Sequence, residues 1–205
     1  MKSLNYKSVK EHKSSVIRNA QYYYKEGATW NRISSSFFAI RYLPKGFIFD
    51  QAGDSLFTNN DTDLFLMVGF LNSSIGFAAM KILCPTLNTT AGNLEDFPYP
   101  KISLHLVPII KDNISKLIVL ATIDWNAYET SWDFTKSPLI QQIQQTLKAN
   151  FEQWKINNGE TITEMQRLEQ ENNRLFIDAY GLQDELTPDV PLEQITLTVN
   201  PKYRY

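Results

Sequence analysis

The stretch EGATWNRISSSFFAIRYLPKGFIFD, Glu26–Asp50, mixes two apolar runs with basic, hydroxyl and indole side chains. Its runs Phe37–Tyr42 and Gly46–Asp50 have the β-branched and aromatic content of strands, and Pro44-Lys45-Gly46 between them is typical of a turn. Tyr22–Tyr24, just upstream, begins a further strand-like run. The stretch therefore predicts a sheet of short strands near the start of the chain.

The composition is that of an ordinary globular domain, with 205 residues of which 43% are hydrophobic and 20% charged. A single cysteine, Cys84, excludes an intrachain disulfide, and with only His12 and His105 to add we expect no His/Cys metal cluster. The polar N-terminal sequence does not resemble a secretory signal. The most apolar stretch, Leu64–Met80, is short for a membrane span, so we expect a buried helix, no membrane partner and a cytoplasmic protein.

The charges are distributed unevenly along the chain. Residues 1–45 have a formal charge of +7 and residues 46–205 have −9, which gives the overall −2. Such a split is typical of a basic face that binds an anionic partner. A solvated basic arm with no partner would give the same pattern, so the charge alone leaves both interpretations open.

Helical patterns follow the predicted strands. Thr62 can cap a helix over about Asp63–Leu83, which Pro85 would end. Cys84–Pro100 is then a long connection, of a length that is usually functional or tightly packed. Apolar spacing favours a further helix over about Lys111–Trp125, although the apolar residues just before it could instead form an edge strand.

The last third of the chain predicts an antiparallel helical hairpin over residues 138–180. Ser137-Pro138 is a typical helix start, Asn157-Asn158-Gly159 a typical end, and Thr161–Glu164 has the spacing of a second cap. Gly181 would close the second helix. The residues after it are punctuated by prolines and predict an extended tail.

No catalytic motif is present. The sequence contains no Gly-x-Ser-x-Gly elbow, no phosphate-binding P-loop and no His-Glu-x-x-His. His12 and His105 have no evident partner, and the acidic residues Asp124, Glu129 and Asp133 alternate with aromatics in a way that is typical of packing with a solvated edge. We therefore expect no catalytic residues in this chain.

The opening stretch instead suggests contacts to DNA. Trp30 could stack on a base, Arg32 and Arg41 could bind phosphate or a guanine edge, and Lys45 lies in a turn that can approach a backbone closely. Small hydroxyl donors complete the predicted DNA-facing set: Thr29, Ser34 and Ser35. The alternatives are a polar loop around a structural tryptophan and an Arg41 that pairs with Asp50.

Five segments resemble one protein family. Tyr22–Phe57 resembles the start of the target-recognition domain of adenine-specific DNA methyltransferases of the BREX phage-defence type, PglX-like, and more loosely that of fused restriction–modification methyltransferases. Leu66–Ser73, Asp124–Leu139 and Glu171–Pro201 resemble later segments of that family. The segment that begins at Cys84 also resembles it, with cysteine in place of the usual asparagine. Together these motifs cover most of the chain from about residue 22.

The resemblance implies an α+β fold and a role in sequence-specific recognition of double-stranded DNA. Together with the patterns above, the expected organisation is a basic lead-in at 1–20, an α+β target-recognition domain at 21–135, a helical hairpin spacer at 136–181 and an extended tail at 182–205. The implied partners are double-stranded DNA, the methyltransferase catalytic domain and other components of the defence system.

Full-length members of the family transfer a methyl group from S-adenosylmethionine to the exocyclic amine of adenine. Their Asn/Asp-Pro-Pro-Tyr/Phe motif is absent here, because Asn200-Pro201-Lys202-Tyr203 lacks the second proline. We therefore expect this chain to bind no cofactor and no metal itself. The alternative function is a docking module that uses the helical hairpin to bind partner subunits or a second copy.

Overall fold

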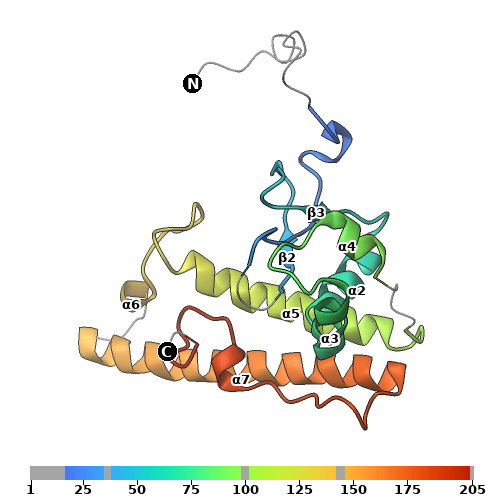
Figure 1. Ribbon diagram of the computed structural model, residues 1–205. Helices are drawn as coiled ribbons and strands as arrows, with labels where there is room; N and C mark the ends of the chain where they lie inside the picture. The colour runs from blue at the N-terminus through green and yellow to red at the C-terminus, as the bar shows by residue number, and fades with distance from the viewer. Residues whose placement is uncertain (1–16, 35–37, 98–101, 142–145, 204–205) are drawn as a thin grey trace.

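The computed structural model describes residues 17–34, 38–97, 102–141 and 146–203, and it confirms the α+β class (Figure 1). A small antiparallel sheet stands on one side of a helical layer. The elements in chain order are η1 (Ala20–Tyr22), β1 (Gly27–Thr29), β2 (Arg41–Leu43), β3 (Ser55–Leu56), α2 (Asp61–Leu71), α3 (Ser74–Leu83), α4 (Ala91–Glu95), α5 (Val107–Asn126), α6 (Pro138–Gln141), α7 (Leu147–Tyr180) and η2 (Leu192–Gln194).

The sheet has the strand order β2-β1-β3, with Ala28 of the central strand opposite Tyr42 and Leu56. The extended backbone continues past β1, since the amide of Trp30 donates to the carbonyl of Asp54 at 3.1 Å. Ala28 and Trp30 point into the core, because alternate residues of an extended chain face opposite sides. Thr29 between them faces the other side and is half-buried.

Two predicted strands are wrong. Gly46–Asp50 forms no strand, because β1 pairs with Ser55–Leu56 on that side, and Gly46 lies in a turn at φ +101°. The run expected from Tyr22 begins as a 3₁₀ helix, and Tyr24 has φ +64°, so pairing starts only at Gly27.

The helix predicted over Asp63–Leu83 is two helices. Asn60, not Thr62, is the cap, since its Oδ1 accepts from the amide of Asp63 at 2.8 Å. The chain breaks at Asn72 and Ser73, where the Ser73 hydroxyl accepts from the amide of Gly76 and starts α3. Periodicity could not show this break, because apolar spacing is preserved on both sides of it.

Asn72 also ties the break to the sheet. Its Oδ1 accepts from the amide of Ile40 at 3.0 Å, and its Nδ2 donates to the carbonyl of Ile40 at 2.9 Å. No single helix in the described ranges is long and apolar enough to cross a membrane; α2 and α3 together have the length and composition, but as a pair bent by 74°.

The core lies between the sheet, α2, α5 and α7. Phe70 at its centre is fully buried and contacts the rings of Phe97, Phe176 and Tyr180 at centroid distances of 5.3, 5.3 and 5.5 Å. Burial of a large aromatic side chain stabilises the fold by about 1.5–3 kcal/mol. The C-terminal half of α7 is therefore part of the same core as the sheet.

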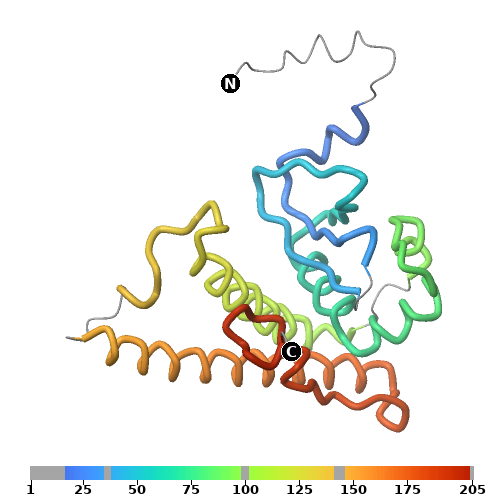
Figure 2. The backbone as a smooth tube through the Cα atoms, turned by 60° about the vertical axis from the view of Figure 1, so that its left-hand side comes forward, coloured from blue at the N-terminus to red at the C-terminus, as the bar shows by residue number. Residues whose placement is uncertain are grey.

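The predicted hairpin over residues 138–180 is also wrong. α7 runs unbroken through Asn157-Asn158-Gly159, because Asn157 remains within the helix and accepts bonds from Gln153 and Thr161. The antiparallel pair is instead α5 with α7, which lie side by side in both views (Figures 1 and 2). The predicted end at Gly181 is confirmed, since Gly181 is left-handed at φ +66°.

The residues after α7 fold back onto the helix pair rather than projecting as a tail. Ile195 and Leu197 are fully buried in a cluster with Met165 of α7. The carboxylate of Asp124, at the end of α5, accepts from the amides of Thr198 at 2.6 Å and Val199 at 3.2 Å. This buried carboxylate therefore fixes the C-terminal segment.

Candidate nucleic-acid interface

Two arginines of the predicted set lie at one end of the sheet. Arg41 is exposed opposite Thr29, and its Nη1 donates to Oδ1 of Asn31 at 3.1 Å. Arg32 is half-buried, and its Nε donates to Oδ1 of Asn88 at 3.2 Å. Both guanidinium groups are thus oriented by a neutral amide.

The position of Asn88 depends on the connection after α3. The amide of Ser34 donates to the carbonyl of Leu87 at 3.0 Å, and the amide of Thr89 donates to the carbonyl of Arg32 at 2.7 Å. These bonds extend the central strand along the segment around Asn88. The long connection predicted from Cys84 is therefore ordered here against the arginine-bearing strand.

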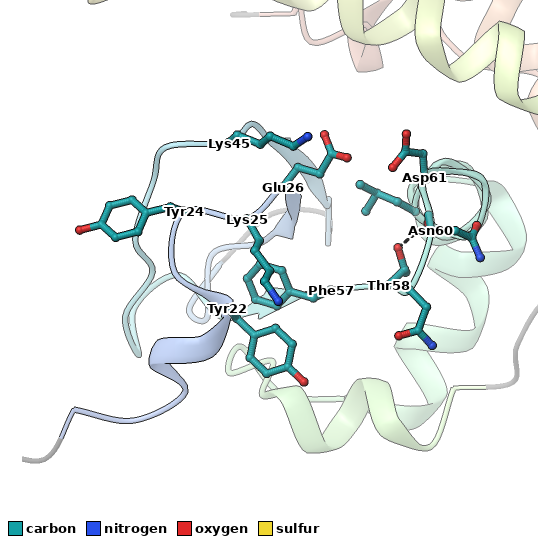
Figure 3. Close-up of a pocket in the computed structure, with 11 residues that line it drawn as sticks. Tyr22, Tyr24, Lys25, Glu26, Lys45, Phe57, Thr58, Asn60 and Asp61 are labelled. Carbon is teal, nitrogen blue, oxygen red and sulfur yellow. Dashed lines mark hydrogen bonds between the residues drawn. The ribbon is translucent and has the colours of Figure 1, made fainter.

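Lys45 lies at the other end of the sheet, beyond β2. Together with Lys25 it lines a cavity of 560 Å³ that also includes Glu26 and Asp61 (Figure 3). Within the described residues none of Lys25, Lys45, Arg32 and Arg41 forms an ion pair with a carboxylate. The predicted DNA-facing residues therefore form two separate basic groups.

Glu26 is held in the cavity wall by Tyr42. The phenol of Tyr42 donates to Oε2 of Glu26 at 2.8 Å. Burial, with a further contribution from this hydrogen bond, raises the pKa of Tyr42 to about 12. Tyr42 thus stays a neutral donor at physiological pH and fixes the orientation of the carboxylate.

Trp30 does not face outward. It is only 2% exposed, its Nε1 donates to the carbonyl of Thr89 at 3.1 Å, and its ring packs against Phe38. The predicted stacking of Trp30 on a base is therefore wrong for this conformation, and the alternative of a structural tryptophan holds. The sequence gave no sign of this, because the buried Trp30 lies between the half-buried Thr29 and the exposed Asn31.

The hydroxyl residues of the set differ in their surroundings. The hydroxyl of Thr29 donates to the carbonyl of Asp54 at 3.0 Å, so it holds the sheet together. Ser34 is half-buried beside Leu87, and Ser35 lies outside the described residues. The hydroxyl hydrogen of Thr29 is therefore used within the fold, and a phosphate contact by Thr29 would be additional to this bond.

Sequence reasoning missed several exposed groups. Asn31 and Asn88 orient the arginines, and Lys25 shares the cavity with Lys45. An aromatic pair, Phe47 and Trp132, stacks at 6.1 Å although Trp132 is 90% exposed. The one available signal was the length of the connection that carries Asn88.

The candidate catalytic residues do not converge. His105 is exposed and its Nδ1 contacts the hydroxyl of Ser103 at 2.9 Å, while Asp124 binds backbone amides of the C-terminal segment. Asn200 is likewise structural, since its Nδ2 donates to the carbonyls of Leu192 and Ile195. In the part of the chain that the structure describes, no group of three or more His, Cys, Asp or Glu side chains could hold a metal ion.

Comparison with known proteins finds sequence relatives of this chain. The chain is 36% identical over 176 residues to the adenine-specific methyltransferase PglX of Lacticaseibacillus casei strain Zhang, an alignment that covers 83% of the chain. The chain is homologous to one part of an adenine-specific methyltransferase. A second methyltransferase homologue, BrxX of Escherichia coli O9:H4 strain HS, is 33% identical over 191 residues, or 92% of the chain.

These matches confirm the resemblance noted in the sequence. The chain spans only 14% and 15% of the length of PglX and BrxX, respectively. No protein-family model matches it. The similarity therefore concerns a limited region of two long methyltransferases.

Proposed function

We propose that this chain is the DNA-recognition part of an adenine-specific methyltransferase that acts in phage defence. The homology to PglX and BrxX supports a role in such a system. Methyl transfer from S-adenosylmethionine would be carried out by another part of the longer protein, since the chain has no catalytic motif. Its partners would be double-stranded DNA, the catalytic domain and other components of the system.

The observation that carries this proposal is the way in which Arg32 and Arg41 are held. Asn88 and Asn31 each accept one hydrogen bond and bring no negative charge. A guanidinium has further N–H donors that can bind phosphate or guanine in a bidentate manner. The two groups thus keep their charge and most of their donors for an external anion.

The two basic groups suggest a division of labour. Arg32 and Arg41 would contact base edges or phosphates at one end of the sheet, while Lys45 and Lys25 would contact the backbone at the other. Ser34 and Ser35 stay in the proposed set as phosphate donors, and Thr29 as a neighbour of Arg41. Phosphate contacts would supply most of the affinity and make it salt-dependent.

The test measures binding of the chain to a mixed-sequence duplex by fluorescence anisotropy over a series of salt concentrations. Arg41→Ala and Arg32→Ala should each weaken binding by about 1–3 kcal/mol if the residue reads a base. A phosphate contact should instead lower the slope of log affinity against log salt by about one. Arg167→Ala, a change on α7, is the matched control and should leave binding unchanged. Equal affinity of all three variants would remove the sheet arginines from the interface.

A second function is favoured by the far ends of the helix pair. Four apolar side chains in the C-terminal half of α5 and the first turns of α7 are exposed: Val119, Ile123, Leu147 and Phe151. A contiguous patch of exposed apolar side chains is typical of a protein-binding surface. A docking module would self-associate or bind a subunit in a salt-insensitive way, which sedimentation of the chain at several concentrations would detect.

A further inference from the structure

The segment that carries Arg32 is one half of a two-stranded ribbon. Ile33 pairs with Asn88 in an antiparallel bridge, and backbone hydrogen bonds of 3.0 and 2.7 Å flank this bridge on its two sides. We call residues 31–34 together with residues 87–89 the Ile33–Asn88 ribbon. Its two halves come from distant parts of the sequence, so it is a product of the fold and not of one loop.

The core holds the ribbon from below. The indole Nε1 of Trp30 donates to the carbonyl of Thr89 at 3.1 Å, and Trp30 is only 2% exposed. On the other half, the thiol of Cys84 donates to the carbonyl of Asn88 at 3.3 Å. The side chains of the ribbon are therefore presented from a supported backbone, as a specific binding surface requires.

One face of the ribbon combines an aliphatic side chain with a guanidinium. Residues directly opposite each other in an antiparallel pair have their side chains on the same face, so Ile33 and Asn88 lie together. Ile33 is 73% exposed, and Oδ1 of Asn88 accepts from Nε of Arg32 at 3.2 Å. This bond leaves both Nη groups of Arg32 to bind a partner end-on.

The charge of the ribbon is purely positive. The sequence has no Asp or Glu in residues 27–34 or 84–94, and Arg32 is the one charged residue of these two segments. A two-stranded ribbon also fits the major groove of B-DNA, which is about 12 Å wide. Shape and charge therefore both favour duplex DNA as the occupant of this face.

We propose that the Ile33–Asn88 ribbon enters the major groove of the target, where Arg32 binds the O6 and N7 of a guanine and Ile33 contacts the methyl group of a thymine. The proposal rests on the DNA-recognition function above. The thymine methyl is an apolar group that the base edges present in the major groove, and O6 and N7 of guanine accept from an arginine fork there. Asn88 is a positioning residue, since it acts through Arg32.

The two bases belong to neighbouring base pairs. Arg32 and Ile33 are consecutive, and consecutive Cα atoms lie about 3.8 Å apart, close to the rise of about 3.4 Å per base pair. A phosphate contact would account for Arg32 but not for Ile33, because the DNA backbone offers no methyl group. A docked protein would cover Ile33 without any dependence on base identity.

The experiment first selects duplexes that the chain retains from a library with a randomised central segment. Fluorescence anisotropy then measures binding to the enriched sequence, which we expect to contain a guanine next to a thymine on either strand. Uracil in place of that thymine removes only the methyl group and should weaken binding about fourfold. 7-Deazaguanine in place of the guanine removes the N7 acceptor and should weaken binding about fivefold.

Protein variants assign each effect to a side chain. Ile33→Ala should remove the uracil effect and keep the 7-deazaguanine effect. Asn88→Ala should do the reverse, because Arg32 then keeps its charge but is no longer oriented toward guanine; a ribbon that had merely come apart would lose both effects. Ile82→Ala, at an isoleucine of α3 that is 80% exposed, is the matched control and should keep both.

Equal affinity for thymine and uracil at every selected position would overturn the proposal and is the result that a protein-docking ribbon gives. A uracil effect that persists in Ile33→Ala, or a selection that yields no common sequence, would overturn it as well. The uracil comparison uses the unaltered chain, so it does not depend on the folding of a variant. If Arg41→Ala weakens binding to a mixed-sequence duplex while uracil has no effect, only the ribbon assignment fails; if the chain binds no duplex, the DNA-recognition function itself fails.

Discussion

The arginines of the sheet and of α7 have opposite kinds of partner. Arg41 and Arg32 each donate to an asparagine, whereas Arg167 on α7 donates to Glu164 at 2.8 Å and to Glu171 at 2.9 Å. The hydrogen bond from Arg167 lowers the pKa of Glu164, and the two carboxylates raise the pKa of Arg167. Charge is compensated on the helix and left uncompensated on the sheet.

This difference shows how one residue type serves two purposes. An amide partner orients a guanidinium without consuming its charge, while a carboxylate partner does both. The formal charge of +7 in residues 1–45 is therefore not only a matter of composition. The described part of that region also lacks internal carboxylate partners for its arginines, which is what an anion-binding surface requires.

The largest expected effect tests whether the arginine-bearing segment is held by a core residue. Trp30→Ala should lower the free energy of unfolding by about 3–5 kcal/mol, because it empties a buried site. Urea denaturation measures this change. Trp132→Ala, at a tryptophan that is 90% exposed, is the control and should change stability by less than about 1 kcal/mol. Similar losses for both variants would contradict the assigned roles.

A smaller effect concerns Glu169 on α7, whose carboxylate forms no ion pair with any residue that the structure describes. Burial raises the pKa of Glu169 to about 7. The folded state therefore holds this proton more tightly than the unfolded state, so the contribution of Glu169 to stability is fully present below about pH 4.5 and is lost as the pH rises through about 7. Glu169→Gln should add about 1–3 kcal/mol to the free energy of unfolding at pH 8 and little at pH 4.

Denaturation midpoints between pH 4 and pH 8 measure this effect. Glu164→Gln is the matched control on the same helix. Because the pKa of Glu164 is lowered in the folded state, its ionised carboxylate stabilises the fold above the unfolded pKa, and this stabilisation is lost as the pH falls. A Glu169→Gln variant whose stability follows the wild-type pH profile would show that this carboxylate is solvated.

The smallest effect compares the arginines directly. Arg167→Ala should cause a slight loss of stability that disappears at about 1 M salt, since exposed ion pairs are weak and screened. Arg41→Ala should change stability even less, because its partner Asn31 is neutral. Its effect should be on DNA binding alone. A destabilisation by Arg41→Ala larger than that of Arg167→Ala would mean that Arg41 is structural.

Helical spacing predicted the presence of helices better than it predicted the residues at which they begin and end. The helix expected over Lys111–Trp125 lies within α5, and Gly181 ends α7 as expected. The break at Asn72 and the continuity through Gly159 were not predictable, because both depend on distant or helix-wide contacts. A glycine inside a helix costs about 1 kcal/mol, which the other residues of the 34-residue helix outweigh.

Part of the candidate site could also be predicted from the sequence. Residue type correctly placed Arg41 and Lys45 at the surface, as polarity requires. Trp30 was misplaced because the residue pattern of an irregular strand does not reveal which face the core covers. The orienting role of Asn88 needed the pairing of two segments that lie 56 positions apart.

The bend at Asn72 and Ser73 has a consequence for the order of folding. The amide of Ser74 donates to Oδ1 of Asn173, which lies 99 positions later in the chain. At about 5–20 residues per second, a ribosome reaches that position about 5–20 s after it has made the bend. During this interval the bend, and through Asn72 the backbone of Ile40 next to Arg41, has no α7 to rest on. The arginine-bearing edge is thus synthesised before the helix against which its bend rests.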